Sequence, residues 1–326
     1  MKNPCPARVY YLASGMLGVP VMDALLADKR IQLVGAGTQP DRPAGRKRQP
    51  VPSPVGQHAA QLGLPLDKPE SVNTEEFLEH LRALAPDLVL VASFGQILKK
   101  PLLALPAAGC LNVHASLLPR HRGAAPINAA ILEGDEATGV SFMEMEAGLD
   151  TGPVYSTVPT RIDENETAAE LEAKLGILAA EHVVDCILGV ACGRLKATPQ
   201  SKTGATYVGK LRKEDGLLNW TLPAVTLARR VRGLQPWPKT HTFIPSAKGM
   251  RRVQITQVRI PAPGDNSDAK PGEVVRADRS AWLVACGEGT LEIRRAAPEG
   301  RREMDAQEFL RGFPLKVGCI LGGPLP

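Results

Sequence analysis

The stretch EEFLEHLRALAPDLVLVA, residues 75–92, contains the two patterns that decide the fold class. From Glu75 to Leu84, apolar residues recur among charged ones at helical spacing, whereas Leu88 to Ala92 is an uninterrupted apolar run. A strand that is apolar on both faces suits a parallel sheet that helices cover on both sides. The stretch therefore predicts one helix–strand unit of an α/β domain.

The same rhythm extends over the first half of the chain. No Gly-x-Gly-x-x-Gly motif follows the first expected strand, which argues against an oxidoreductase with a nucleotide cofactor. We predict a Rossmann-like parallel-sheet domain over residues 1–195, with functional groups at the carboxyl ends of its strands. Its further strands are expected at residues 9–13, 32–36, 110–114, 139–145 and 154–162, and its further helices at 17–27 and 166–188.

The second half has a different pattern. Residues 196–206 are polar and contain Pro199 and Gly204, so we place a linker there. Several short strands with Gly and Pro turns then predict a smaller OB-like β-barrel domain over residues 207–326. Its helices are expected at 207–215 and 222–233, and its strands at 242–244, 253–260, 272–276, 282–286 and 291–294.

Charge also separates the two halves. From Ser201 onward, 21 Lys and Arg face 12 Asp and Glu, a net charge of +9, whereas residues 1–200 carry 18 against 22, a net charge of −4. A basic domain suits a polyanionic partner, because neutralising phosphates is the main source of sequence-independent affinity for nucleic acids. Charge alone leaves open a basic surface that has no partner.

Composition and cysteine spacing exclude several classes of protein. Hydrophobic residues at 44% and charged residues at 22% are typical of a globular protein. The longest apolar candidate, Val183 to Cys192, contains Asp185 and is far shorter than the roughly 20 residues of a membrane helix. Residues 1–9 lack the apolar core of a signal peptide, so we expect a cytoplasmic protein. Because the six cysteines form no Cys-x-x-Cys pair, we expect free thiols and no metal site.

Three polar residues are candidates for catalysis. Asn112 and His114 are two residues apart on an expected strand, so their side chains share one face. Asp150 stands in the loop Gly148-Leu149-Asp150-Thr151-Gly152, which could fold back toward them. Taken singly, each residue also has a structural explanation, as a strand end, a core histidine or a turn cap.

The joint occurrence of these residues resembles the active-site motif of the folate-dependent formyltransferases. The motif reads Leu111-Asn112-Val113-His114-Ala115-Ser116-Leu117-Leu118-Pro119-Arg120 in this chain. The resemblance implies that Asn112, His114 and Asp150 are catalytic, and formyl transfer to an amine has a use for each. The Asn amide donates to the developing oxyanion, the His moves the proton, and the carboxylate orients the imidazole.

The resemblance also implies a site for 10-formyltetrahydrofolate, the formyl donor. Ser116, Leu117, Leu118 and Pro119 match the folate-binding turn of the family. Residues 94–98 match the segment that lines the folate site, with Phe94 where Tyr is usual, and the residues expected to line it are Phe94, Gly95, Ile97 and Leu98.

Within the family, the chain resembles the branch that formylates the amino group of methionyl initiator tRNA for translation initiation. Residues 38–48 look like the basic loop with which those enzymes grip the acceptor end of the tRNA. Its cations suit phosphate contacts, and they are Arg42, Arg46, Lys47 and Arg48. The second half matches through Tyr207, Lys210 and Pro236-Trp237-Pro238, so we expect Lys210 to contact tRNA as well. We expect a monomer.

Two departures from the family pattern bear on the site. Ala13-Ser14-Gly15 replaces the usual Gly-Thr-Pro, and His121 stands where Trp is common, which places a second titratable group near His114. The alternative functions within the fold are those of a sugar-nucleotide N-formyltransferase, a formyltetrahydrofolate hydrolase or dehydrogenase domain, and a glycinamide ribonucleotide formyltransferase. A sugar nucleotide does not require the four cations of the loop. A non-enzymatic RNA-binding protein is disfavoured by the intact catalytic set.

Overall fold

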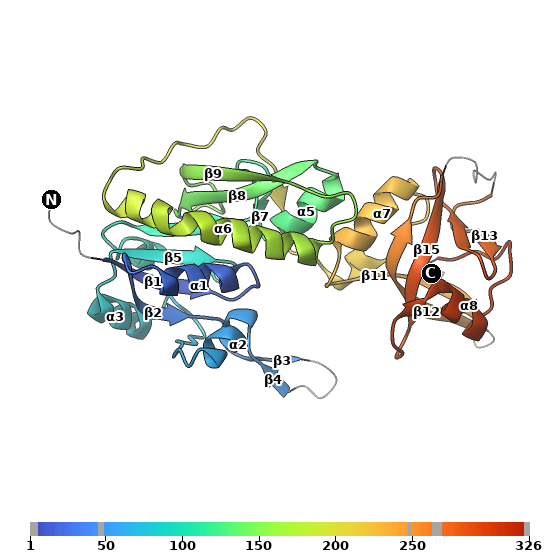
Figure 1. Ribbon diagram of the computed structural model, residues 1–326, viewed down its shortest axis with the longest axis horizontal. Helices are drawn as coiled ribbons and strands as arrows, with labels where there is room; N and C mark the ends of the chain where they lie inside the picture. The colour runs from blue at the N-terminus through green and yellow to red at the C-terminus, as the bar shows by residue number, and fades with distance from the viewer. Residues whose placement is uncertain (1–5, 45–48, 247–248, 263–268, 323–326) are drawn as a thin grey trace. The chain divides into compact units, whose positions relative to one another are not determined.

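The computed structural model describes residues 6–44, 49–246, 249–262 and 269–322 (Figure 1). The chain divides into two compact units. Unit 1 comprises Met1–Pro126, Ala137–Arg161 and Leu171–Val208, and unit 2 comprises Ile127–Glu136, Ile162–Glu170 and Gly209–Pro326.

Unit 1 is built on a six-stranded sheet in the order β2-β1-β5-β6-β8-β9. The first four strands are parallel, whereas β8 and β9 are antiparallel to their neighbours. The predicted Rossmann-like fold class is confirmed, but the sheet is mixed, because the short connection from β8 to β9 can join only antiparallel strands. The strands are β1 Ala7–Ala13, β2 Ile31–Gly37, β5 Leu88–Ala92, β6 Cys110–His114, β8 Ala137–Glu144 and β9 Val154–Arg161.

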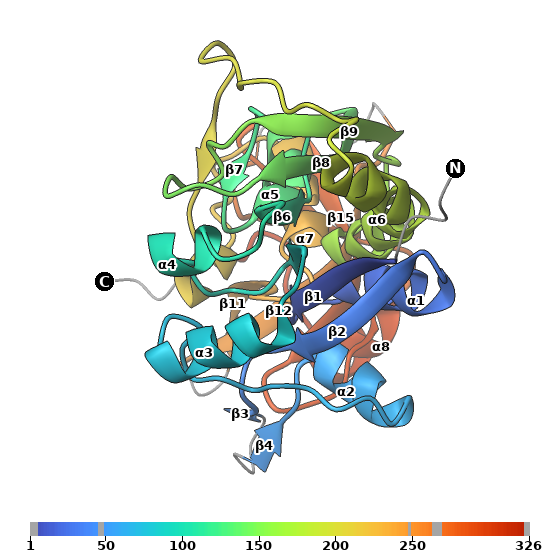
Figure 2. The ribbon, with the colours of Figure 1, turned by 90° about the vertical axis from the view of Figure 1, so that its left-hand side faces the viewer.

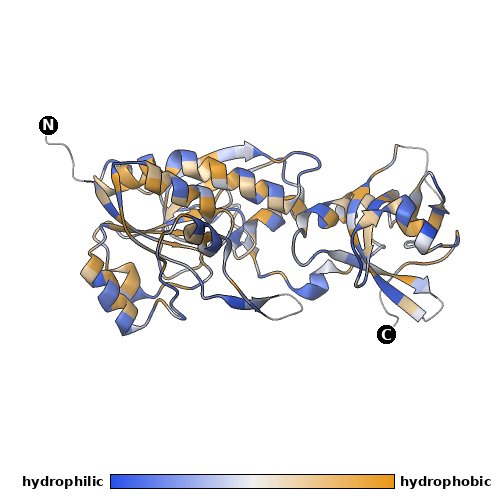
Figure 3. Cartoon of the chain, turned by 60° about the horizontal axis from the view of Figure 1, so that its bottom comes forward, coloured by the Kyte–Doolittle hydropathy of each residue, from blue (hydrophilic) through white to orange (hydrophobic). Residues whose placement is uncertain are grey.

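Helices cover both faces of this sheet. Helices α3 and α4 lie on one side, and α1 and α6 lie on the other (Figure 2). The hydropathy colours of Figure 3 show apolar and polar residues mixed along α6, the longest helix. The helices of these layers, with α2 at the margin, are α1 Gly18–Ala27, α2 Pro54–Gln61, α3 Glu75–Leu84, α4 Lys100–Leu103 and α6 Ala168–Ala191.

Helix α3 shows why the quoted stretch folds as predicted. The Thr74 side chain caps its first turn by accepting from the backbone N–H of Phe77, and the helix ends at Ala85, which has a left-handed φ of 43°. Phe77 and Leu81 lie on the buried face and pack into one cluster with residues of β1 and β5. Burial of this apolar stripe fixes α3 against the sheet.

Two short pairs of strands complete unit 1. Strands β3 (Arg42–Ala44) and β4 (Gln49–Val51) form an antiparallel hairpin. Strands β7 (Arg122–Gly123) and β10 (Tyr207–Val208) pair in parallel.

The helix predicted over residues 207–215 is wrong. Strand β10 begins this stretch, and only a 3-10 turn, η1 (Lys213–Gly216), follows it. The carbonyl of Val208 accepts from the backbone N–H of Ala124 at 2.9 Å, so this segment finds its backbone partner far away in the sequence. Pairing with a distant strand outweighs the local helical preference.

Unit 2 contains a half-barrel of antiparallel strands in the order β11-β12-β15-β14-β13, with β16 paired to β15. This agrees with the predicted OB-like second domain. Its elements are α5 Pro126–Glu133, α7 Ala224–Gly233, β11 Thr240–Ser246, β12 Gly249–Arg259, β13 Val274–Ala277, β14 Trp282–Ala285, β15 Thr290–Pro298, β16 Met304–Asp305 and α8 Ala306–Gly312.

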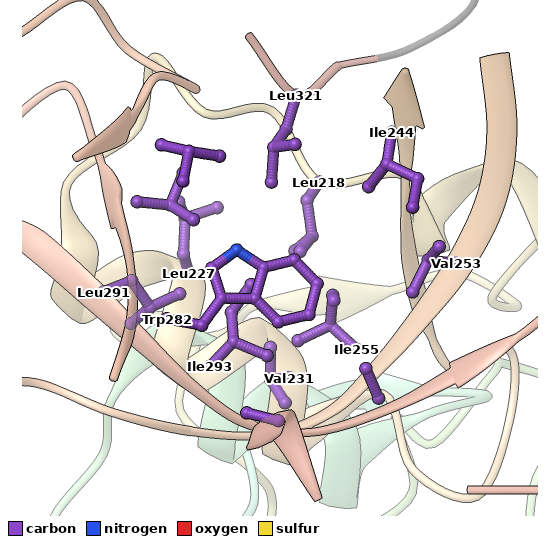
Figure 4. Packing of buried hydrophobic residues seen from close by; sticks show 14 of the residues in the cluster. Leu218, Leu227, Val231, Ile244, Val253, Ile255, Trp282, Leu291, Ile293 and Leu321 are labelled. Carbon is purple, nitrogen blue, oxygen red and sulfur yellow. The ribbon is translucent and has the colours of Figure 1, made fainter. Parts of the chain in front are cut away.

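An aromatic pair lies in the core of unit 2. The rings of Trp282 and Phe309 are stacked, with centroids 4.8 Å apart and an interplanar angle of 22°. Figure 4 shows Leu227 and Val231 of α7 and Ile293 of β15 around the indole. Both aromatic side chains are fully buried, so this pair joins β14 and α8 into one core.

The described residues contain neither a membrane-spanning helix nor a metal-binding cluster. No helix in them has the length and apolar character needed to cross a membrane. Their cysteines are free, and no cluster of three or more His, Cys, Asp or Glu in the same residues could hold a metal ion. Cys192 is exposed and Cys319 is half-buried, whereas the buried thiols are those of Cys110, Cys186 and Cys286.

We predict that Trp282→Ala destabilises unit 2 by about 3–5 kcal/mol, the usual cost of deleting a buried aromatic side chain. Trp282→Phe should cost less, because the indole Nε1 has no hydrogen-bond partner among the described residues. Urea denaturation followed by circular dichroism measures both losses. Trp237→Ala is the control, since that indole is 53% exposed and its loss should stay within about 0.5 kcal/mol. Equal losses for Trp282→Ala and Trp237→Ala would contradict the assignment of the core.

Candidate active site

The carboxyl end of β6 carries two polar side chains on one face. Asn112 is half-buried, and His114, two residues later, is 5% exposed. In the sheet, Asn112 is opposite Met143 and His114 is opposite Ser141, both on β8. Parallel strands place such residues at the edge where α/β proteins hold their ligands.

A hydrogen bond fixes the proton on one nitrogen of His114. Nε2 lies 2.9 Å from the backbone carbonyl oxygen of His121. Because a carbonyl oxygen only accepts, Nε2 carries a hydrogen and donates it. Nδ1 is therefore the nitrogen that can take up and release a proton. His121 itself has a φ of 57°, which is uncommon for a residue other than glycine.

Asp150 approaches the other side of the imidazole. Its Oδ2 lies 3.7 Å from His114 Nδ1 and accepts a 2.7 Å hydrogen bond from the backbone N–H of Gly123. The longer distance exceeds that of a hydrogen bond, so the carboxylate acts on the imidazole through its charge. The structure thus brings together the Asp150 and His114 side chains, as the sequence predicted for the loop at residues 148–152.

The environment of His114 favours the neutral imidazole. Burial lowers the pKa of His114 below its ordinary value, and the nearby His121 imidazole lowers this pKa further. The Asp150 carboxylate and the hydrogen bond to the His121 carbonyl raise the pKa of His114, but burial is the larger effect. At neutral pH, Nδ1 is consequently free of a proton and can accept one.

The turn after β6 is held by internal hydrogen bonds. Ser116 is buried, and its hydroxyl donates to the carbonyl of Arg120 at 2.6 Å. The Ser141 hydroxyl donates to the carbonyl of Ser116 at 2.7 Å, and it accepts from the N–H of Leu118 at 3.1 Å. The peptide bond between Leu118 and Pro119 is cis. Ser116 therefore shapes the turn, while Leu117, Leu118 and Pro119 are partly exposed.

The segment after β5 is divided between core and surface. Phe94 and Leu98 are buried in the cluster beneath α3 and α4, whereas Gly95 and Ile97 are exposed. Ile97 is 76% exposed, and Leu149, next to Asp150, is 59% exposed. Four residues of this segment are predicted to contact folate. Of these four, only Gly95 and Ile97 are exposed and can offer surface to a ligand directly. Phe94 and Leu98 back the segment from the core.

The residues predicted to contact tRNA belong to other segments of the sequence than the candidate catalytic and folate-binding residues. Arg42 is exposed on the hairpin β3–β4 and pairs with Glu70, with 2.8 Å between guanidinium and carboxylate. Arg46, Lys47 and Arg48 lie outside the described residues. Lys210 is exposed near the start of Gly209–Pro326, the last segment of unit 2.

The structure adds two residues that the sequence patterns did not single out. Gln200 donates from Nε2 to the backbone carbonyls of Asp150, at 2.9 Å, and Gly152, at 2.7 Å. Arg122 donates to the Gln200 side-chain oxygen from Nε at 3.0 Å and from a terminal nitrogen at 2.8 Å. Arg122 stands two residues after the motif at residues 111–120, but its partner Gln200 is 78 residues away. No local pattern could have indicated this contact.

Two family models match the chain. The model described as "Formyl transferase" matches residues 8–187, and the model described as "Formyl transferase, C-terminal domain" matches residues 210–314. The candidate catalytic residues therefore fall within the first matched region, and most of the basic second half falls within the second.

Curated relatives resemble the chain over most of its length. Methionyl-tRNA formyltransferase of Acidithiobacillus ferrooxidans is 46% identical over 293 residues, which cover 89% of this chain and 91% of that protein. The enzyme of the same name from Geotalea daltonii is 38% identical over 315 residues, with 97% of this chain and 98% of that protein covered.

Solved structures share the fold at low sequence identity. The structure of HypX from Aquifex aeolicus in complex with tetrahydrofolic acid is 16% identical, with a TM-score of 0.64, and the match covers 95% of this chain and 48% of that one. A sugar N-formyltransferase from a Shewanella species is 17% identical, with a TM-score of 0.59 and coverage of 76% and 96%. At these identities the likeness supports the fold alone.

We predict that Asp150→Asn lowers the pKa of His114 further. The substitution removes the negative charge that favours the imidazolium, while burial, which disfavours the imidazolium, remains. An NMR titration of the histidine ring protons measures this pKa. Asp41→Asn is the control, because Asp41 pairs with Lys68 at 2.7 Å elsewhere in unit 1. An unchanged pKa of His114 in Asp150→Asn would show that the carboxylate does not act on the imidazole.

Proposed function

Since the chain belongs to the formyl transferase family, we propose that it transfers the formyl group of 10-formyltetrahydrofolate to the amino group of methionyl initiator tRNA. The product is the N-formylmethionyl-tRNA that begins translation, and we place the reaction in the cytoplasm. One observation carries the choice of acceptor. Over 89% of this chain, the sequence is 46% identical to a curated methionyl-tRNA formyltransferase.

The three polar residues near the end of β6 suit the chemistry. The Asn112 amide donates to the formyl oxygen as this oxygen gains negative charge, a contribution of about 2.7–4 kcal/mol in comparable sites. His114 Nδ1 accepts the proton that the attacking amine loses and can return one to the departing folate nitrogen. Asp150 supports the imidazolium through its charge, 3.7 Å from Nδ1. The formyl donor supplies an activated one-carbon group, and the protein supplies position and proton transfer.

Two exposed apolar residues of unit 1 fit a folate substrate. Ile97 and Leu149 belong to the loops that follow β5 and β8, and an isoleucine or leucine this exposed leaves a large apolar surface in water. A flat heteroaromatic ring can cover such surface. We therefore assign the donor to this part of unit 1.

The charge distribution suits a tRNA acceptor. Residues 201–326 carry a net charge of +9, and the stretch of sequence from residue 42 to residue 48 adds four cations. A tRNA requires many phosphate contacts, whereas a sugar nucleotide requires few. A sugar-nucleotide N-formyltransferase is therefore the second candidate, favoured only by the fold shared with the Shewanella enzyme.

The decisive experiment measures transfer of radiolabelled formyl from 10-formyltetrahydrofolate to methionyl initiator tRNA. Elongator methionyl-tRNA and an amino-sugar nucleotide are run in parallel, and release of tetrahydrofolate is followed in each reaction. We expect label in the initiator tRNA alone. Label in the sugar nucleotide alone would favour the second candidate. Folate release without a labelled acceptor would indicate hydrolysis.

Alanine at Asn112, His114 or Asp150 should lower kcat about 100-fold or more, because Asn112 and His114 act on the reacting atoms and Asp150 supports the imidazolium of His114. Binding of methionyl-tRNA, measured by filter retention, should change less than about twofold. The matched control is His80→Ala, which removes a half-exposed histidine that pairs with Asp67 at 3.1 Å. Normal turnover in any one of the three variants would remove that residue from the mechanism.

Arg42→Ala should raise the KM for tRNA. It should also reduce the slope of log KM against log salt concentration by about 1, the effect of losing one phosphate contact. Glu70→Gln should act in the opposite direction, because it frees the Arg42 guanidinium from its 2.8 Å ion pair. Arg82→Ala is the control, since Arg82 is also exposed and paired, at 2.6 Å to Glu75. Identical salt slopes for Arg42→Ala and Arg82→Ala would show that Arg42 does not contact phosphate.

A further inference from the structure

The loop that carries Asp150 is held in place by the Gln200 side chain. The amide nitrogen of Gln200 donates to two carbonyls of this loop, those of Asp150 and Gly152. Asp150 has a φ of 52°, a backbone conformation that persists in a non-glycine residue only where its surroundings impose it. The two hydrogen bonds from Gln200 are such a restraint, and they act directly on the backbone of the residue whose carboxylate approaches His114.

Arg122 fixes the orientation of the Gln200 amide. Its guanidinium directs two N–H groups to the Gln200 oxygen and a third to the Tyr207 hydroxyl at 2.7 Å, and it lies 5.4 Å from the centre of the Tyr207 ring. Because the Gln200 oxygen accepts from Arg122, the amide nitrogen must face the loop. The amide accepts through its oxygen and donates through its nitrogen, which neither a carboxylate nor an apolar side chain can do.

The same part of the chain supports the partner of His114. The Thr206 hydroxyl oxygen accepts from the backbone N–H of His121 at 2.8 Å, and the His121 carbonyl accepts from His114. The backbone N–H of Arg122 donates to the Thr206 carbonyl at 2.9 Å. Gly123, whose N–H binds Asp150, allows this close approach, because a Cβ there would lie 2.2 Å from the Val208 carbonyl oxygen. Residues 200–208 thus restrain both sides of the imidazole.

We propose that Gln200 is a positioning residue for catalysis, which holds the Asp150 carboxylate beside His114 Nδ1 while Arg122 holds Gln200. The expected effect on kcat rests on the proposed function, whereas the pKa of His114 can be measured by NMR without substrate. The titratable groups that act on His114 are Asp150, from the loop after β8, and His121, from the turn after β6. Of these two, Gln200 contacts only the loop of Asp150.

Gln200→Glu is the sharpest test. The carboxylate can still accept from Arg122, so the contact between residues 122 and 200 is kept, but it cannot donate to the carbonyls of Asp150 and Gly152. We expect kcat to fall about 10-fold or more, since displacing a catalytic group by about 1 Å can cost up to 100-fold. The KM values for tRNA and folate should stay within about twofold. In Gln200→Ala, which loses both sets of contacts, kcat should fall at least as far.

The pKa of His114 provides the readout without substrate. Asp150 raises this pKa, so a displaced carboxylate should lower it in Gln200→Glu and Gln200→Ala. Gln235→Glu is the matched control, because the Gln235 amide also donates to two backbone carbonyls, those of Val231 at 3.1 Å and Thr256 at 2.6 Å, in unit 2. This control should leave the pKa of His114 unchanged.

A double-mutant cycle separates positioning from a general loss of structure. In an Asp150→Asn background, Gln200→Glu should change neither kcat nor the pKa of His114 further, because the group that Gln200 holds is already neutral. A full additional loss of kcat in that background, or a wild-type pKa of His114 in Gln200→Glu, would overturn the proposal. If wild-type protein formylates no tRNA, the proposed function fails, while the pKa of His114 still decides the role of Gln200.

Discussion

The hydrogen bond from His114 Nε2 to the carbonyl of His121 is the constraint on which the arrangement of the site depends. It commits one ring nitrogen to a backbone acceptor, so only Nδ1 can exchange a proton. In the proposed reaction, the group that gives up a proton must then approach Nδ1. Asp150 lies 3.7 Å from Nδ1, and Asn112 shares the same strand face through the two-residue period of β6. A single buried contact thereby decides where the substrates must meet.

Two opposing effects set the proton affinity of that nitrogen. Burial disfavours the imidazolium, and the Asp150 carboxylate favours it. One pKa unit corresponds to about 1.4 kcal/mol. A displacement of the carboxylate that weakens its interaction with the imidazolium by about 1.4 kcal/mol therefore lowers the pKa of His114 by about one unit. A neutral histidine can accept a proton, but the resulting charge needs support in a dry site. The position of Asp150 therefore matters more than its mere presence in the sequence.

The sequence allowed the prediction of what local patterns and family motifs encode. Strands β5 and β6 begin and end at the residues expected from the sequence, 88–92 and 110–114. Asn112, His114 and Asp150 were identified as candidates from their strand period, their glycine-flanked loop and their resemblance to a family motif. The antiparallel edge of the sheet and the strand β10 were missed, because both depend on pairing between distant segments. The same reason applies to Gln200 and Arg122, whose side chains meet across 78 residues.

Residues 196–206 show how composition can conceal a structural role. Polar residues with Pro199 and Gly204 are typical of a spacer, yet backbone groups of this segment are bonded within unit 1. Thr198 exchanges two 2.8 Å hydrogen bonds with Val154, and Thr206 bonds to the turn after β6. The polar side chains of Gln200 and Thr206, which suggest solvation, supply hydrogen bonds to the segments that hold the two candidate catalytic residues. Since Gln200 bonds to the loop of Asp150 and Thr206 to the backbone of His121, an insertion or deletion between Thr198 and Thr206 would shift the supports of His114 and Asp150 together.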